Sequence, residues 1–141
     1  MDSIIIERIW EDDEFFEVKF SANSNVICAQ VKSYTTKKSI SNLIAGLESF
    51  TIKQDDRFFW ENGKEGDLST PYISLEVWNE DKCGHIIIEV YMELEDGAAY
   101  GKHNCRFYVK SELGLLNQFG KALHKLNEPG IGAKAVLNEV W

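Results

Sequence analysis

The chain has 141 residues, of which 44% are hydrophobic and 27% are charged, and it contains 2 prolines and 10 glycines. Because this mix is typical of a globular protein, it excludes disorder, collagen-like repeats and coiled coil, and residues 1–141 are expected to form a single domain. The apolar runs are far shorter than the roughly 20 residues that a membrane-spanning helix needs, so no membrane partner is expected.

The charge of the chain indicates what kind of partner it attracts. There are 23 Asp and Glu residues against 15 Lys and Arg residues, which gives a net charge of −8. Residues 1–96 carry a net charge of −11, whereas residues 97–141 carry +3. An acidic chain repels the phosphate backbone, so no nucleic-acid partner is expected, and it attracts basic proteins. Solubility is the alternative explanation of the same acidic balance.

The cysteines and the N-terminal residues indicate the compartment. Cys28, Cys83 and Cys105 are an odd number of cysteines spread through predicted strands, which does not suit a secreted disulfide framework. The apolar residues 4–6 give way at once to Glu7, so no export signal is expected. A cytoplasmic location is therefore predicted.

The first half of the chain predicts three strands and a helix. The strands are expected at residues 3–10, 15–21 and 26–34. Phe16, Val18 and Phe20 alternate with polar residues, as in a strand with one buried face. The period then changes to three and four, which predicts a helix over residues 39–50 with Ser39 as its N-cap. The apolar stripe of this helix is Ile40, Leu43, Ile44, Leu47 and Phe50.

The second half repeats this plan. Four strands are expected, at residues 57–60, 72–79, 85–94 and 105–110. A second helix is expected over residues 113–126, with Ser111 as its cap and Pro129 and Gly130 at its end. Its apolar stripe is Leu115, Leu116, Phe119, Leu123 and Leu126. Residues 130–141 are expected to dock on the domain as a short helix or an apolar tail.

The links within each run of strands are short, which favours antiparallel pairing because parallel strands need long crossover connections. The sequence therefore predicts an α+β fold with a mostly antiparallel sheet of about six or seven strands and two helices packed on one face.

Two Cys–His pairs are the strongest candidate for a metal site. Cys83 and His85 lie at the start of one predicted strand, and His103 and Cys105 lie at the start of the next. Two cysteines and two histidines are of the types that bind zinc. If residues 95–103 form the hairpin loop, about eight strand residues, on the order of 26 Å, separate the pairs. No metal site is therefore expected.

Catalytic and cofactor motifs were sought along the whole chain. The sequence has no G-x-S-x-G elbow and no G-x-x-x-x-G-K-[ST] phosphate loop. Its adjacent carboxylates lie in predicted loops, where solvated charge is the ordinary state. We therefore expect a non-enzymatic protein with no catalytic residues and no cofactor.

The aromatic residues point to a binding surface. Phe59 and Trp60 cannot both face the core from one strand, so one of them is expected to point outward. An exposed ring among acids has the composition of a protein-binding hot spot, although Trp78 could instead cover its cross-strand neighbour. The residues expected to contact a partner are Asp12, Asp13, Glu14, Asp55, Asp56, Trp60, Glu61, Glu65, Asp67 and Trp78.

The order of these elements resembles a known family. It combines an N-terminal hairpin, a Leu/Phe-patterned helix at residues 39–50, a strand ending in an aromatic residue, a long strand opened by Gly84 and His85, and a second Leu/Phe helix at residues 113–126. Over nearly its whole length the chain resembles the small bacterial immunity proteins of the WapI type, encoded beside contact-dependent toxins. The resemblance implies a protein that binds and neutralises a cognate toxin domain, often a basic nuclease.

The expected function is thus the neutralisation of a cognate toxin protein through an acidic surface that carries aromatic side chains. Two other classes stay open. A small-molecule-binding protein or small enzyme would have a pocket between sheet and helices, with titratable groups of displaced pKa. A structural or oligomerisation domain would expose a large apolar patch.

Overall fold

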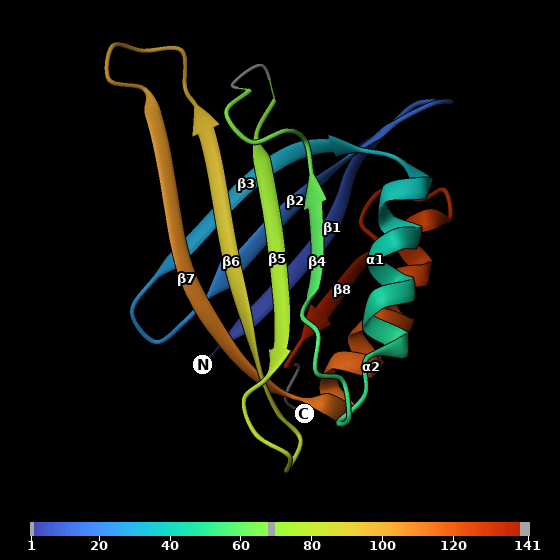
Figure 1. Cartoon of the computed structure of the whole chain (residues 1–141). Coiled ribbons are helices and arrows are strands. Elements are labelled where there is room, and N and C mark those ends of the chain that lie inside the picture. Colours follow the sequence, from blue (N-terminus) through green and yellow to red (C-terminus); the bar gives the residue numbers. More distant parts are fainter. Residues whose placement is uncertain (1, 68–69, 139–141) are drawn as a thin grey trace.

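The computed structural model describes residues 2–67 and 70–138 and has an α+β fold (Figure 1). Its elements are β1 (Ser3–Glu11), β2 (Phe16–Asn23), β3 (Cys28–Thr35), α1 (Lys37–Ser49), β4 (Phe58–Asn62), β5 (Tyr72–Asn79), β6 (His85–Glu95), β7 (Lys102–Glu112), α2 (Leu113–Ala122), the 3₁₀ helix η1 (Leu123–Asn127) and β8 (Lys134–Leu137). Within the described ranges, no helix has the length and apolar character needed to cross a membrane.

The strands form two antiparallel sheets. The first sheet has the order β3-β2-β1-β8, and the second sheet has the order β4-β5-β6-β7. The two sheets pack as layers (Figure 1). The predicted α+β class and antiparallel pairing are confirmed, but the single sheet of six or seven strands is wrong, since eight strands form two sheets. Because α1 interrupts the series of hairpins, the strands before and after it pair separately, and β8 adds an eighth strand.

The core lies between the sheets and continues under the helices. Phe20 of β2 and Val90 of β6 are fully buried and belong to one apolar cluster. Complete burial of such a side chain stabilises a fold by about 1.5–3 kcal/mol. The two helices lie side by side along one side of the sheets, where α1 contacts β4 and α2 contacts β8 (Figure 1). The whole predicted apolar stripe of α1 is buried.

The N-caps of both helices differ from the predicted ones, although α2 begins at Leu113 as predicted. The N-cap of α1 is Thr36, whose hydroxyl accepts a hydrogen bond from the Ser39 N–H at 3.2 Å, so Ser39 lies inside the first turn. The N-cap of α2 is Glu112, and no side-chain hydrogen bond caps it, so Ser111 is not the cap. Apolar periodicity located the helices, but it did not identify which polar residue ends the preceding strand.

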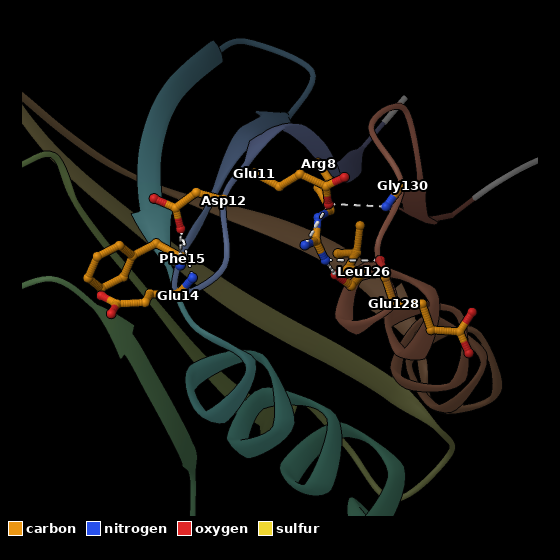
Figure 2. A network of polar contacts seen from close by, with 8 residues as sticks. All are labelled: Arg8, Glu11, Asp12, Glu14, Phe15, Leu126, Glu128 and Gly130. Carbon is orange, nitrogen blue, oxygen red and sulfur yellow. Dashed lines mark hydrogen bonds and ion pairs between the residues drawn. The ribbon is translucent and has the colours of Figure 1, made fainter.

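The C-terminal segment forms a strand rather than the expected helix or tail. β8 pairs with β1, and Ile4 lies opposite Leu137. The buried Arg8 fixes the approach to β8, because its guanidinium donates to the carbonyls of Leu126 (2.7 Å) and Glu128 (3.0 Å) (Figure 2). Residues 139–141 of the predicted docking segment lie outside the described residues.

A candidate protein-binding face

The outer face of the second sheet points away from the first sheet, and no described helix or strand covers it (Figure 1). Alternate side chains of each strand point to this face. The strand register arranges them in four rows: Trp78, Ile87 and Lys110; Phe59, Glu76, Glu89 and Tyr108; Glu61, Ser74, Tyr91 and Arg106; Tyr72, Glu93 and Asn104. We call this surface the open face.

Two glutamates oppose each other in the middle of the open face. Glu76 of β5 lies directly across from Glu89 of β6, and their side chains are 30% and 16% exposed. Arg106 forms a close ion pair with Glu89, whereas the Arg57 guanidinium is 3.9 Å from Glu76. Like charges in direct cross-strand register are destabilising. This row is therefore a position at which a cation from another molecule would relieve repulsion.

The same two arginines stack on aromatic rings. The Arg57 guanidinium lies 4.0 Å from the centre of the Trp78 ring, and that of Arg106 lies 4.3 Å from the centre of the Tyr91 ring. Cation–π contacts at exposed sites contribute about 0.5–1 kcal/mol each. Each arginine therefore contacts both a glutamate and an aromatic ring of the face.

Exposed rings lie at both ends of the glutamate row. Phe59 on β4 is 52% exposed, and Tyr108 on β7 is 48% exposed. Phe59 lies across from Glu76, and Tyr108 lies across from Glu89. Rings of this kind provide most of the apolar contact area in protein interfaces, and charged groups beside them provide orientation.

The rim of the face is held by hydrogen bonds to carboxylates. The Gly66 N–H donates to Glu93 at 2.9 Å and is the main cause of the lowered pKa of Glu93. The Tyr91 hydroxyl also donates to Glu93, and this bond raises the pKa of Tyr91 to about 12. Burial, assisted by a hydrogen bond to Glu61, raises the pKa of Tyr72 to about 12. These tyrosines stay neutral and Glu93 stays ionised at physiological pH.

The negative charge of the protein is concentrated in β4, β5, β6 and their loops, whereas β7 of the same sheet is basic. Residues 55–96, which contain β4, β5 and β6 with their loops, hold 12 acids and 3 bases, a net charge of −9. The outer face of the first sheet is different, because Glu7 lies opposite Lys19 on one side and Lys134 on the other. The acidic character of the chain is therefore localised rather than spread evenly.

Six of the predicted contact residues lie on or beside the open face. Exposed acids surround β4 and its loops, and the half-buried Trp78 lies on the face itself; the six are Asp55, Asp56, Glu61, Glu65, Asp67 and Trp78. Trp60 was also predicted to contact a partner, but it does not lie on the open face. Its side chain is buried, and its indole N–H donates to the Ser39 carbonyl at 2.9 Å. The outward ring is Phe59, because Trp60 lies opposite Leu75, whose side chain is in the core.

The other predicted group lies elsewhere. Asp12, Asp13 and Glu14 form the exposed β1–β2 turn of the first sheet and line a hollow of about 460 Å³ with Lys37. Figure 2 shows Asp12 and Glu14 in this turn. One Asp12 carboxylate oxygen accepts the N–H groups of Phe15 (2.7 Å) and Glu14 (2.8 Å), which lowers the pKa of Asp12. Asp12 thus serves to hold its own turn, and we do not include this group in the open face.

The whole row of Phe59, Glu76, Glu89 and Tyr108 was absent from the predicted contacts. Glu76 and Glu89 are ordinary polar positions of alternating strands when each is considered alone. Their opposition depends on the β5–β6 register, which the turn sets through the hydrogen bond from the Glu80 N–H to the His85 carbonyl at 2.9 Å. The sequence signal for this opposition was a pair of predicted strands joined by a connection of only five residues, which is typical of a hairpin.

The two Cys–His pairs lie at opposite ends of the β6–β7 ladder. His85 is paired with Glu112, whereas His103 is paired with Leu94. His85 and His103 instead bind carboxylates, Asp81 at 2.6 Å and Asp96 at 3.0 Å. In the part of the chain that the structure describes, no three His, Cys, Asp or Glu side chains are grouped as metal ligands.

Comparisons of the chain with models of protein families, with curated proteins and with solved structures find no match. The function of the chain is therefore inferred from the geometry and charge of the open face.

Proposed function

We propose that the protein binds a basic protein domain through the open face and acts as an immunity-type inhibitor, without catalysis, in the cytoplasm. The observation that supports this proposal best is the net charge of −9 on residues 55–96, beside an uncovered sheet face with exposed aromatic rings. An acidic surface accelerates encounter with a basic partner, and rings excluded from water on contact provide the affinity.

The proposed mode of inhibition is occlusion. Phe59 and Tyr108 would anchor the partner, and basic side chains of the partner would enter the row between them, where Glu76 and Glu89 oppose each other. A nuclease domain needs a basic surface to hold its phosphate backbone. A protein seated on that surface blocks the substrate without performing chemistry.

The test begins with the reading frame immediately upstream, where a long secreted protein with a basic C-terminal domain is expected. That purified domain is mixed with the protein, and stopped-flow fluorescence measures the association rate at low and high salt. Steered association falls steeply with ionic strength, so a drop of roughly tenfold or more is expected. A rate insensitive to salt, or a neighbouring gene without a basic domain, contradicts the proposal.

Two matched variants locate the site. Glu76→Gln removes one charge from the open face and is expected to slow association about two- to fivefold at low salt. Glu17→Gln removes the same charge from a half-buried outward position of the first sheet, and it is expected to leave the rate nearly unchanged. Equal effects of both variants would mean that only the total charge matters.

A further inference from the structure

The edge of β7 has free hydrogen-bonding groups on its backbone. β7 is the last strand of the second sheet and runs for 11 residues. The Lys110 N–H donates to Asp2 at 2.8 Å, and the Lys110 carbonyl accepts from Asn138 at 2.8 Å, so this residue directs its backbone away from β6. Backbone direction alternates along a strand. Asn104, Arg106 and Tyr108 therefore present their N–H and carbonyl groups at the same edge.

The other edges of the two sheets are less available for pairing with an added strand. α1 lies against β4, and α2 lies against β8, so helices flank both of these edges. On β3 the Tyr34 carbonyl accepts from the Asn62 side chain at 2.9 Å, and Lys32 is the one cation among the exposed residues of that strand. β7 is thus the longest edge that the described residues leave open.

An apolar hollow lies beneath the open part of β7. It has a volume of about 200 Å³ and is lined by Ala29, Val31, Met92, Leu94 and Cys105, together with polar atoms of neighbouring residues. In Figure 1 the β2–β3 connection extends past β7, so the first sheet continues below the vacant position. A strand added beside β7 would direct alternate side chains into this hollow.

The outward side chains of β7 are basic in an acidic protein. Lys102, Arg106 and Lys110 are exposed on the same side of the strand. In an antiparallel pair of two copies centred on Arg106, Lys102 would lie opposite Lys110 and Arg106 opposite its own copy, so all three cations of each copy would face cations. Like charges in register disfavour that dimer, whereas acidic residues in an added strand would be favoured.

We infer that β7 accepts an extended segment of a partner protein as a fifth strand of the second sheet, in which acidic side chains alternate with apolar ones. The acidic side chains pair with the row of Lys102, Arg106 and Lys110, and the apolar side chains enter the hollow. Backbone hydrogen bonds provide affinity in this mode of recognition, and the alternating pockets provide specificity. This site adjoins the proposed contact at Glu76 and Glu89, because Arg106 pairs with Glu89, but its backbone contacts lie at the edge of β7 rather than on the open face.

The test uses a synthetic peptide of four Glu-Val repeats and its charge-reversed counterpart of four Lys-Val repeats. Binding is followed by NMR, with hydrogen exchange of the Asn104, Arg106 and Tyr108 amides as the local measurement. We expect the Glu-Val peptide to bind and to slow exchange at these three amides, with the Lys-Val peptide at least about tenfold weaker. Equal binding of both peptides, or no binding of the Glu-Val peptide, overturns the inference.

A matched pair of variants tests the backbone contact itself. Asn104→Pro removes an N–H that faces the open edge and leaves the ladder with β6 intact, whereas Asn104→Ala keeps that N–H. Loss of one backbone hydrogen bond is expected to weaken the peptide about tenfold in the proline variant and under about twofold in the alanine variant. Equal affinities overturn the inference.

A second arm does not depend on the folding of the proline variant. Two Glu-Val peptides are compared, one N-methylated at every Glu and the other N-methylated at every Val. In one peptide the methyl groups block the N–H groups that face β7, and in the other they block those that face solvent. We expect one peptide to lose binding and the other to keep it, and equal behaviour of the two peptides rejects strand addition.

Discussion

Glu76 and Glu89 lie directly opposite each other across β5 and β6 on a face of the protein that nothing in the described chain covers. Fold stability alone does not favour this arrangement, because cross-strand pairs of like charge are destabilising. Functional sites commonly keep arrangements that lower the stability of the free protein, since a charge that is repelled in the free protein can pair with a partner.

Removing one of these charges is expected to stabilise the free protein. Glu76→Gln should raise the free energy of unfolding by about 0.2–1 kcal/mol, measured by urea denaturation, because the repulsion of Glu89 is lost. Glu17→Gln is the control, since Glu17 lies between Trp10 and Tyr34 rather than opposite a second acid. A loss of stability in Glu76→Gln, or an equal gain in both variants, would contradict the assigned repulsion.

Arg8 is expected to be essential for the attachment of the C-terminal segment. Arg8→Met should lower the free energy of unfolding by about 2–4 kcal/mol, because it removes the ion pair with Glu11 at 2.7 Å and leaves the carbonyls of Leu126 and Glu128 without their donor. Arg8→Lys should recover little of this loss, since one ammonium cannot reproduce the forked geometry. Thermal unfolding by circular dichroism measures the effect. Full recovery in the lysine variant would show that charge alone matters there.

Gly46 is expected to be required by the Phe58 ring rather than by the helix. A Cβ at Gly46 would overlap this ring, where α1 passes over β4. Gly46→Ala should therefore lower stability by about 1–3 kcal/mol, although alanine is favoured over glycine in helices by about 1 kcal/mol. The sign should reverse in a Phe58→Ala background, where the overlap is gone. A double-mutant cycle in urea measures this, and the same sign in both backgrounds would disprove the overlap.

The Asp81–His85 pair predicts a pH dependence. The hydrogen bond that the His85 ring donates to the Asp81 carboxylate, and then the charge of that carboxylate, raise the pKa of His85 above 6.5. The contribution of His85 to stability is therefore complete below pH 6.5 and is lost as pH rises through the raised pKa. The pKa of Asp81 is lowered, chiefly by the Cys83 N–H, so its contribution is present above pH 3.8 and is lost as pH falls through the lowered value.

NMR titration of the His85 ring measures this pair. Asp81→Asn should return the pKa of His85 toward 6.5. Asp96→Asn removes a carboxylate from the β6–β7 turn, where it binds His103, and should leave the pKa of His85 unchanged. An identical His85 titration in the Asp81→Asn variant would exclude Asp81 as the cause.

Periodicity predicted the elements that bury one complete face. The strand at residues 72–79 was predicted with the bounds that the structure gives it, because its alternation is uninterrupted. β7 starts at Lys102, three residues before the predicted start, since both faces are exposed near the hairpin tip and the period carries no signal there. β8 has four residues and becomes a strand only through its pairing with β1. Such short segments are determined by tertiary contacts.

The candidate site was predicted less well for a related reason. Composition identified the acidic and aromatic region, and the acids around β4 lie there. The choice between Phe59 and Trp60 depended on which residue of β4 opposes Leu75, and this register is not encoded in five residues that are mostly aromatic. Opposition of Glu76 and Glu89 is likewise a property of paired strands.

The pairing of β1 with β8 also determines when the protein can fold. The first strand of the chain cannot complete its sheet until the last strand has emerged from the ribosome, and the loop closed by this contact spans almost the whole sequence. Long-range pairing costs loop-closure entropy before its contacts can form. The second sheet is therefore expected to assemble early from its local hairpins, before β1 pairs with β8. Nascent chains are therefore expected to be exposed to misassembly until β8 has been synthesised.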